Sequence, residues 1–315
     1  MEKTGLISSG QAAYDEQVAL LGDRITGEIF FALGLPRSGL LRRSLGALFH
    51  LPAKRFGRVA ANLENETTRA GLGAGARQVM RDFSLTVTTN GVENIPPEGP
   101  VLIISNHPGA YDSVIITACI PRKDLTLVVS DVPFTRALAS ARAHFIFVST
   151  DIPSRMNALR QMVRHLNNGG ALLLFASGEV EPDPAFMPGA AETMATWSRS
   201  IEVLLRKVPE ARLVVEIASG VLLPRFVYNP ITKLRKMPYH QQKLGEMLQI
   251  FQQLLFPKSV GVINAHVSFS KPILPAELTG RAWMPDIVER ARQALEQHIQ
   301  WNLSNAGSPS RLEKE

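Results

Sequence analysis

Residues 101–113 decide the fold, and they read VLIISNHPGAYDS. The apolar run from Val101 to Ile104 is typical of a buried β-strand, and Pro108 with Gly109 predicts a turn directly after it. From Asp112 onward the sequence is apolar again, in the pattern of a helix. This order places His107 at the carboxyl end of a strand, where open α/β sheets usually bind their ligands.

His107 and Asp112 are five positions apart and can therefore face each other across one turn of the chain. A carboxylate in contact with one ring nitrogen fixes the tautomer of a histidine and stabilises the positive charge that develops when the other nitrogen takes a proton. The pair therefore predicts a general base. The same spacing is also common among ordinary turn residues in which the aspartate caps a helix, so both interpretations stay open at this point.

The residues after the strand, Asn106, His107 and Asp112, resemble the first motif of the glycerol-phosphate and lysophospholipid acyltransferases, Asn-His-x-x-x-x-Asp. Residues 92–107 and 267–273 are similar to that family's approach to its active site and to the strand that closes its catalytic domain. The resemblance implies transfer of a fatty acyl group from a thioester, either acyl-CoA or an acyl carrier protein, to a hydroxyl or amine of a lysolipid-like acceptor. His107 is then the general base and Asp112 orients it, with no metal or bound cofactor.

Two further motifs of that family are present in position but altered in content. Thr150 stands where the second motif ends in an arginine, and residues 175–180 read FASGEV where the family reads Phe-Pro-Glu-Gly-Thr-Arg. In the family these basic residues hold the phosphate of the acceptor, a task that suits a guanidinium group. Their replacement argues against a phosphate-bearing acceptor. The residues expected to bind substrate are Asn106, Gly109, Thr150, Phe175, Ser177, Gly178 and Glu179.

Glu179 and Glu181 add acidic groups where the family has a cation. If both face the pocket, they favour an acceptor with an amine or many hydroxyls. The alternative is a solvated turn, because residues 179–184 are rich in proline and acid. The three arginines of the next upstream helix pattern, Arg155, Arg160 and Arg164, have the spacing of a solvated stripe, which we favour over a phosphate site.

Two other functions remain open. A serine hydrolase could use Ser177 with His107 and Asp112, although Ser177 lacks the Gly-x-Ser-x-Gly sequence of such enzymes. A lipid-binding protein without catalysis is suggested by the missing arginines, although both His107 and Asp112 are present. In an acyltransferase, backbone amides around Gly109 and Gly178 are the candidates for stabilising the oxyanion.

The composition favours a folded protein with an anionic partner. Of the 315 residues 45% are hydrophobic, and 34 lysines and arginines against 28 acids give a net charge of +6. No interleaving of aromatic and basic residues indicates nucleic-acid binding, so an anionic membrane surface is the expected partner. The one cysteine, Cys119, lies in an apolar run and is expected to pack as a small hydrophobe in a reducing compartment.

Residues 24–58 have the composition of a segment that lies on a membrane. Apolar side chains alternate with cations, each contributing about 1 kcal/mol near an anionic surface. The alternative is a helical hairpin, broken at Pro36 and Pro52, that packs its leucines onto the rest of the protein. Neither a secretory signal nor a spanning run of about 18 apolar residues is visible. We therefore expect a cytoplasmic protein, peripheral on the inner face of the membrane.

The whole chain is expected to contain a mixed, largely parallel α/β sheet flanked by helices, because strand-like and helix-like segments alternate from residue 84 onward. Residues 1–82 are the N-terminal helical membrane-surface segment, 83–303 the acyltransferase catalytic domain and 304–315 a flexible tail. The glycines at 71–75 predict a flexible joint. A terminal helix is expected over 283–303, with His298 on its packed face. The expected strands cover residues 84–89, 101–105, 125–129, 145–148, 171–176, 213–218 and 260–269.

Residues 231–243 form a second basic stretch. Its cations suit the phosphates of a membrane or of coenzyme A, and an ordinary solvated loop is the alternative.

Overall fold

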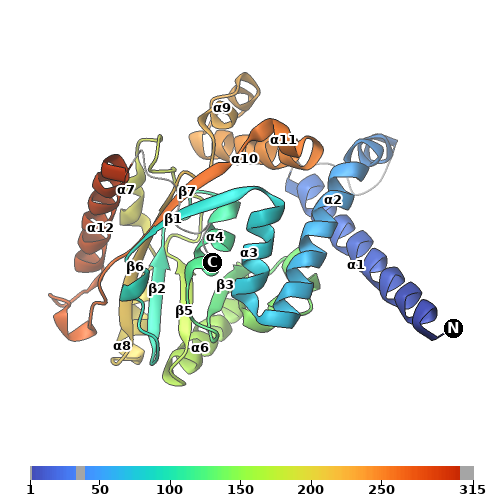
Figure 1. Ribbon diagram of the computed structural model, residues 1–315. Helices are drawn as coiled ribbons and strands as arrows, with labels where there is room; N and C mark the ends of the chain where they lie inside the picture. Colours follow the sequence, from blue (N-terminus) through green and yellow to red (C-terminus); the bar gives the residue numbers. More distant parts are fainter. Residues whose placement is uncertain (1, 33–39, 306–315) are drawn as a thin grey trace.

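A seven-stranded sheet lies between two layers of helices in the computed structural model, which describes residues 2–32 and 40–305 (Figure 1). The strand order is β1-β7-β6-β2-β5-β3-β4, and every neighbouring pair is parallel except the antiparallel pair of β6 and β7. The prediction of a mixed, largely parallel sheet flanked by helices is confirmed. The strands are β1 (Leu85–Asn90), β2 (Val101–Ser105), β3 (Thr126–Ser130), β4 (Phe145–Val148), β5 (Ala171–Phe175), β6 (Arg212–Ser219) and β7 (Ile263–Phe269).

Strand β2 lies in the middle of the sheet and is buried on both faces. Val101 and Ile103 belong to the hydrophobic core on one face, whereas Leu102 and Ile104 belong to the core on the other face. Because helices cover both faces, the strand is apolar at every position and does not alternate with polar residues. Strand β7 begins at Ile263, later than residue 260, because Pro257–Val260 form the short helix α11.

The first core joins the sheet to helices α1 to α4 and α10, and the second joins it to α6, α8 and α12. Figure 1 shows α3 and α12 on opposite sides of the sheet. The helices are α1 (Glu2–Ala32), α2 (Leu40–Ala70), α3 (Leu72–Asp82), α4 (Ala110–Cys119), α5 (Pro133–Ala137), α6 (Ile152–Asn167), α7 (Ala190–Thr193), α8 (Ser200–Lys207), α9 (Pro224–Val227), α10 (Pro238–Leu255), α11 and α12 (Met284–Asn305).

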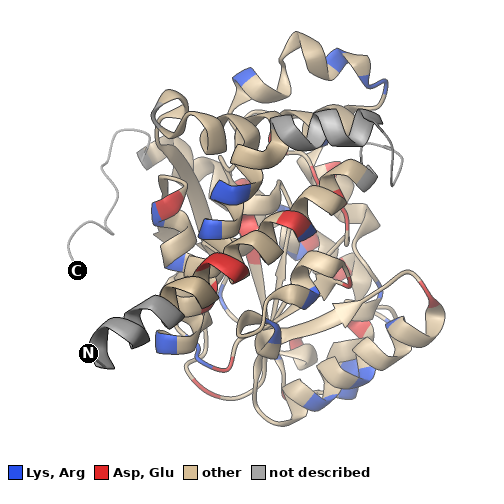
Figure 2. Cartoon of the chain, turned by 90° about the vertical axis from the view of Figure 1, so that its right-hand side faces the viewer, with Lys and Arg blue, Asp and Glu red and all other residues tan. Residues whose placement is uncertain are grey.

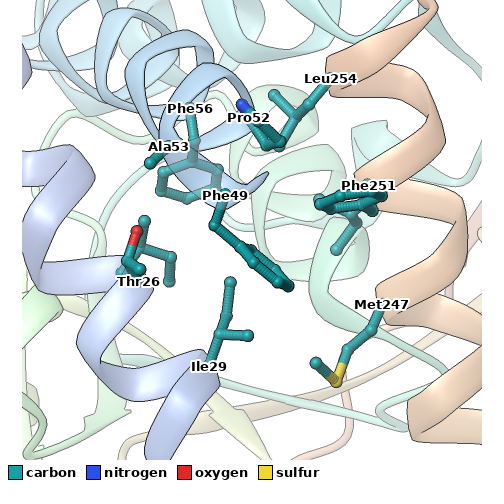
Figure 3. A pocket seen from close by; sticks show the side chains of 11 residues that line it. Thr26, Ile29, Phe49, Pro52, Ala53, Phe56, Met247, Phe251 and Leu254 are labelled. Atoms are coloured by element: carbon teal, nitrogen blue, oxygen red, sulfur yellow. The ribbon is translucent and has the colours of Figure 1, made fainter. Parts of the chain in front are cut away.

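Helix α2 continues through Pro52, so the predicted break at this proline is wrong, while Pro36 lies outside the described residues. Pro52 is buried and lines an apolar cavity of about 140 Å³ between α1, α2 and α10, shown in Figure 3 with Phe49 and Phe251. The packing of its ring compensates for the hydrogen bond that a proline cannot donate.

The flexible joint predicted at residues 71–75 is also wrong, because α3 begins at Leu72. Gly71 turns the chain between α2 and α3 with a φ of +87°, a value that favours glycine. A Cβ at Gly75 would lie 2.8 Å from the carbonyl oxygen of Leu63. Gly71 therefore allows the turn between the two helices, and Gly75 allows their close contact.

The described part of segment 24–58 packs against α10. Phe30 is buried, and the ring of Phe49 lies 5.3 Å from that of Phe30 and 5.2 Å from that of Phe251. Arg55 donates to the carbonyl oxygens of Leu254 and Leu255, at 2.6 and 2.8 Å. These residues favour the helical-hairpin alternative. Leu51, Lys54 and Arg58 are exposed, and the side chains of residues 31–48 lie outside the description.

The predicted terminal helix is confirmed as α12, and residues 306–315 of the expected tail lie outside the described part. His298 is buried between Ser219 and Ser268, whose hydroxyls lie 2.7 and 2.6 Å from its ring nitrogens. Burial lowers the pKa of His298 to about 3, so its ring is neutral and packed, as predicted. Among the residues described, no helix is both long and apolar enough to span a bilayer.

Candidate active site

The turn after β2 is tied to the neighbouring strand by the side chain of Asn106. Its amide donates to the carbonyl oxygen of Ala218 at 3.0 Å and its oxygen accepts from the N–H of Ala218 at 2.8 Å. Asn106 is buried, and these two bonds continue the pairing of β2 with β6 by one residue. His107 consequently leaves the sheet at a fixed point on its carboxyl edge.

Asp112 makes both of the contacts that the sequence left open, one to His107 and one to the start of a helix. Its Oδ2 lies 2.7 Å from Nδ1 of His107 and accepts from the N–H of Gly109 at 3.1 Å, at the amino terminus of α4. The carboxylate is fully buried, whereas the His107 side chain is 24% exposed. Because Nδ1 is held by Asp112, Nε2 is the nitrogen that can take a proton.

The ring of His107 lies against Phe175, with the two ring centroids 4.4 Å apart and an angle of 31° between the planes. Phe175 ends β5, which pairs with β2 so that Ser105 is opposite Phe175. The parallel register of two central strands therefore brings this predicted substrate-binding residue onto the histidine.

Helix α10 contributes a buried polar stripe that the sequence reasoning missed. Gln242 donates to the carbonyl oxygens of Pro108 and Glu181, at 2.9 and 2.6 Å. Glu246 accepts from the N–H of Ala110, the first residue of α4. A Cβ at Gly109 would lie 2.8 Å from the same carboxylate oxygen, so only glycine leaves room for this contact. Helix α10 thus holds the turn that carries His107.

The stripe continues along α10 with Gln249 and Gln253. Gln249 bonds to the backbone of Leu223 and Val221, and Gln253 bonds to the Tyr111 hydroxyl and the Phe83 carbonyl oxygen. Polar residues at 242, 246, 249 and 253 repeat at helical spacing. That spacing is the signal that could have identified a buried polar face in advance.

The loop after β5 is partly buried, which corrects the solvated-turn interpretation of residues 179–184. Glu181 is 2% exposed, donates its N–H to the carbonyl oxygen of His107 at 2.7 Å, and accepts from Trp197 Nε1 at 3.0 Å. Asp183 is fully buried and accepts from the N–H groups of Gly220, Val221 and Leu222. N–H donors reach both oxygens of Asp183, whereas in Glu181 Trp197 reaches Oε1 and Oε2 is buried without a hydrogen-bond partner among the described residues.

Carboxylates dominate the electrostatics around His107. Burial raises the pKa of Glu246 and that of Glu181 to about 7 each. Burial lowers the pKa of His107, but the charge and hydrogen bond of Asp112, with the charges of Glu246 and Glu181, outweigh it and raise that pKa overall. The surrounding acids thus stabilise an imidazolium, the species that a general base forms when it takes a proton.

The other predicted substrate-binding residues lie on the loops after β4 and β5. Ser177 Oγ donates to the carbonyl oxygen of Glu179 at 2.8 Å, and no hydrogen bond joins it to His107 among the described residues. Glu179 is exposed and accepts from the Tyr239 hydroxyl of α10. Thr150 is exposed beyond β4, which β3 and β5 separate from β2.

Oxyanion donors were expected among the backbone amides around Gly109 and Gly178, and the N–H groups of these two glycines themselves are already hydrogen-bonded. The N–H of Gly109 donates to Asp112 and that of Gly178 donates to the carbonyl oxygen of Phe175, at 3.2 Å. Both amides close local turns, and an oxyanion site among the neighbouring backbone amides stays a prediction. Arg155, Arg160 and Arg164 are exposed on α6, which confirms the solvated stripe.

Cys119 ends α4 and is half-buried. Burial raises the pKa of its thiol to about 12, so the thiol stays protonated at neutral pH. The residues described contain no group of three or more histidine, cysteine, aspartate or glutamate side chains that could hold a metal ion.

Part of the chain is similar to known acyltransferases. The family model described as Acyltransferase matches residues 86–204, which include His107, Asp112 and the loop with Glu181. The matched segment lies within the part of the chain for which the sequence predicted an acyltransferase, and it supports that prediction there. The chain is also similar to the crystal structure of the 1-acyl-sn-glycerophosphate (LPA) acyltransferase PlsC from Thermotoga maritima, with 15% identity and a TM-score of 0.42 over 90% of this chain and 95% of that one. No curated protein matches the sequence significantly.

Proposed function

We propose that this protein transfers a fatty acyl group from a thioester donor, acyl-CoA or acyl carrier protein, to a hydroxyl or amine of a lysolipid-like acceptor. Nε2 of His107 takes the acceptor proton, and the freed oxygen or nitrogen attacks the thioester carbonyl carbon. The C–S bond then breaks, and the leaving sulfur takes the proton back from His107. The observation that carries the proposal is the Nδ1 contact of His107 with buried Asp112, at 2.7 Å, within the matched acyltransferase segment.

An apolar cavity beside the histidine turn is the proposed site of the acyl chain. It has a volume of about 380 Å³ and is bordered by Ala110 and Tyr111, which directly follow the turn. Ile25, Phe56 and Ile250 border both this cavity and the smaller one in Figure 3. The two cavities together offer a fatty chain an apolar path away from His107, which suits the burial of methylene groups.

For the acceptor, the acidic surroundings of His107 support a lysolipid without a phosphate beside the reacting hydroxyl. Glu181 and Glu246 lie close enough to His107 for their charges to raise its pKa, and Glu179 lies exposed on the neighbouring loop. Competition between amine-bearing, polyhydroxyl and phosphate-bearing lysolipids tests this part. A preference for the phosphate-bearing acceptor would overturn it.

We further propose that the reaction takes place on the inner face of an anionic membrane, with the protein peripheral and its first 82 residues contributing to attachment. The net charge of +6 supports an anionic surface. The acceptor itself is held in the bilayer, which an enzyme must then reach.

The test of the reaction is thiol release from long-chain acyl-CoA, measured with and without lysolipid acceptors. Wild-type release should require an acceptor, and His107→Ala should lower it by about 10²- to 10⁴-fold, the usual contribution of a general base. Asp112→Asn should lower kcat with little change in KM, because the base loses its supporting charge while the substrate pocket keeps its shape.

The same assay separates the competing functions. Release without an acceptor that is lost in Ser177→Ala would indicate a hydrolase. No release with either acyl-CoA or acyl carrier protein, from a protein that still binds lysolipid, would indicate a binding protein.

A further inference from the structure

The stretch of chain from the end of β6 to just past β7 carries almost only positive charges. Residues 217–276 contain seven lysines and arginines and a single acid, Glu246, which is buried at the active site. Figure 2 shows blue and no red at the top of the molecule, where Figure 1 places α9. Lys233, Arg235 and Lys236 are exposed, and among the described residues none of the three forms an ion pair. Their positive charge is therefore open to an external partner.

Large apolar side chains are exposed among these cations. Ile231 is 51%, Leu234 80% and Met237 61% exposed, and Tyr228 lies close by in the sequence at 57%. Exposed apolar side chains next to unpaired cations are unusual on a surface that meets only water, and they indicate an interaction site. We call residues 225–243 the apical surface.

Local hydrogen bonds, one of them buried, tie the chain of the apical surface together. Thr232 is 1% exposed, and its hydroxyl donates to the carbonyl oxygen of Val227 at 2.8 Å. Asn229 accepts from the N–H of Ile231 at 3.0 Å, and Gln241 donates to the carbonyl oxygen of Arg235 at 2.7 Å. The apolar side chains therefore point outward from an ordered support.

The apical surface lies next to the active site along α10. Met237 precedes the first residue of α10, and Gln242, which bonds to Pro108 and Glu181, follows five positions later. Five residues of α-helix advance about 7 to 8 Å. Tyr239, between them, bonds to Glu179 on the loop after β5. Anything that binds to the apical surface therefore lies next to the loops around His107.

We propose that the apical surface docks on an anionic lipid bilayer, with Lys233, Arg235 and Lys236 at the phosphate headgroups and Ile231, Leu234 and Met237 in the interfacial apolar layer. An acidic protein partner would pair with the cations, but the three exposed apolar side chains interleaved with them fit a lipid interface better. The proposal rests on the proposed function only for the identity of the substrate, since lipid binding is measured without turnover.

Co-sedimentation of the full chain with vesicles tests the proposal, using phosphatidylcholine alone or with 30% phosphatidylglycerol, about one anionic lipid in three. The triple variant Lys233→Gln, Arg235→Gln, Lys236→Gln should bind the anionic vesicles at least about tenfold more weakly than wild type. The double variant Leu234→Ser, Met237→Ser should weaken binding to both kinds of vesicle. The matched control is the triple variant Arg155→Gln, Arg160→Gln, Arg164→Gln on α6, which removes the same amount of positive charge. It should change binding less than about twofold, because salt screens charges that do not lie close to the headgroups.

Equal losses from the two triple variants would overturn the proposal, because net charge alone would then explain binding. A second result would also overturn it: the protein binds an acyl carrier protein in the absence of vesicles, and of the two triple variants only the one at residues 233, 235 and 236 loses that binding. His107→Ala should bind vesicles like wild type. A wild-type protein without transferase activity whose vesicle binding still depends on the apical surface would refute the proposed function and leave this inference standing.

Discussion

At the scale of single residues, the candidate site depends on buried carboxylates that are held by N–H donors. Glu246 is the clearest case, because it caps α4 through Ala110 from a helix far away in the sequence. Its burial favours the protonated form. The free energy of unfolding of the protein is therefore expected to depend on pH through Glu246.

We expect Glu246→Gln to change the pH dependence of stability. Glu246 has a pKa raised from 4.5 to about 7 by burial, so its contribution to stability is complete below pH 4.5 and is lost as the pH rises through 7. Glutamine resembles the protonated form, so the variant should gain stability relative to wild type between pH 4.5 and pH 8, by up to about 3 kcal/mol. Urea unfolding at both pH values measures this, with exposed Glu289→Gln as the control. An equal effect of pH on the variant and on wild type would contradict it.

The sequence could predict the part of the site that is local. His107 and Asp112 are five residues apart, and a strand, a turn and a helix start fix their relation. Glu246 lies 136 residues from Ala110, so no local pattern links the two. The sequence left Glu181 open between the pocket and a solvated turn, because its loop has the composition of such a turn, and only the tertiary packing around Trp197 shows its burial.

At the scale of elements, helices α1 and α2 cross at two glycines. A Cβ at Gly22 would lie 2.7 Å from the carbonyl oxygen of Ala53, and a Cβ at Gly57 would overlap the carbonyl oxygen of Val18. Glycine costs a helix interior about 1 kcal/mol relative to alanine, and here it allows the two backbones to approach closely.

Gly57→Ala is therefore expected to destabilise the protein by about 1 to 3 kcal/mol, because the added methyl group forces α1 and α2 apart. Gly27→Ala is the matched control in α1, where nothing lies within 4 Å of the added Cβ. It should be neutral or stabilising by up to about 1 kcal/mol. Thermal or urea unfolding measures both, and equal effects would contradict the close crossing.

Elements with a continuous apolar pattern were predicted well, and those with conflicting local signals were not. β2, at the centre of the sheet, and β4, at its edge, begin and end as expected, since each is a short and almost wholly apolar run. Helix α3 was mistaken for a joint because glycines weaken a helical pattern, and the hairpin alternative placed a break at Pro52 because proline usually interrupts a helix. In both cases tertiary packing overrides the local preference.

At the scale of the whole molecule, the N-terminal helices and the sheet share one hydrophobic core. Val18, Leu21 and Ala61 belong to the same cluster as Val101 and Ile115. The division into a segment 1–82 and a domain 83–303 stays a proposal about function, and the two parts are not expected to unfold separately.

We expect a single unfolding transition in urea. Trp197 and Trp283 lie in or against the core on the other face of the sheet, so their fluorescence reports the far side of the molecule from α1 to α3. Hydrogen exchange of peptides from residues 10–30 and 72–82 should show the same midpoint, because two-state domains lose all probes together. Loss of protection in those peptides at lower urea would contradict the shared core.

The protonated thiol of Cys119 has a practical consequence for spectroscopy. With a pKa of about 12, it is ionised to roughly one part in 10⁴ at pH 8, whereas an exposed cysteine is ionised to about a quarter. Since the chain has no other cysteine, a cysteine introduced at position 234 becomes the one fast-reacting thiol of the native protein. A polarity-sensitive dye attached there can report directly how deeply that position enters a bilayer, with the natural sequence otherwise intact.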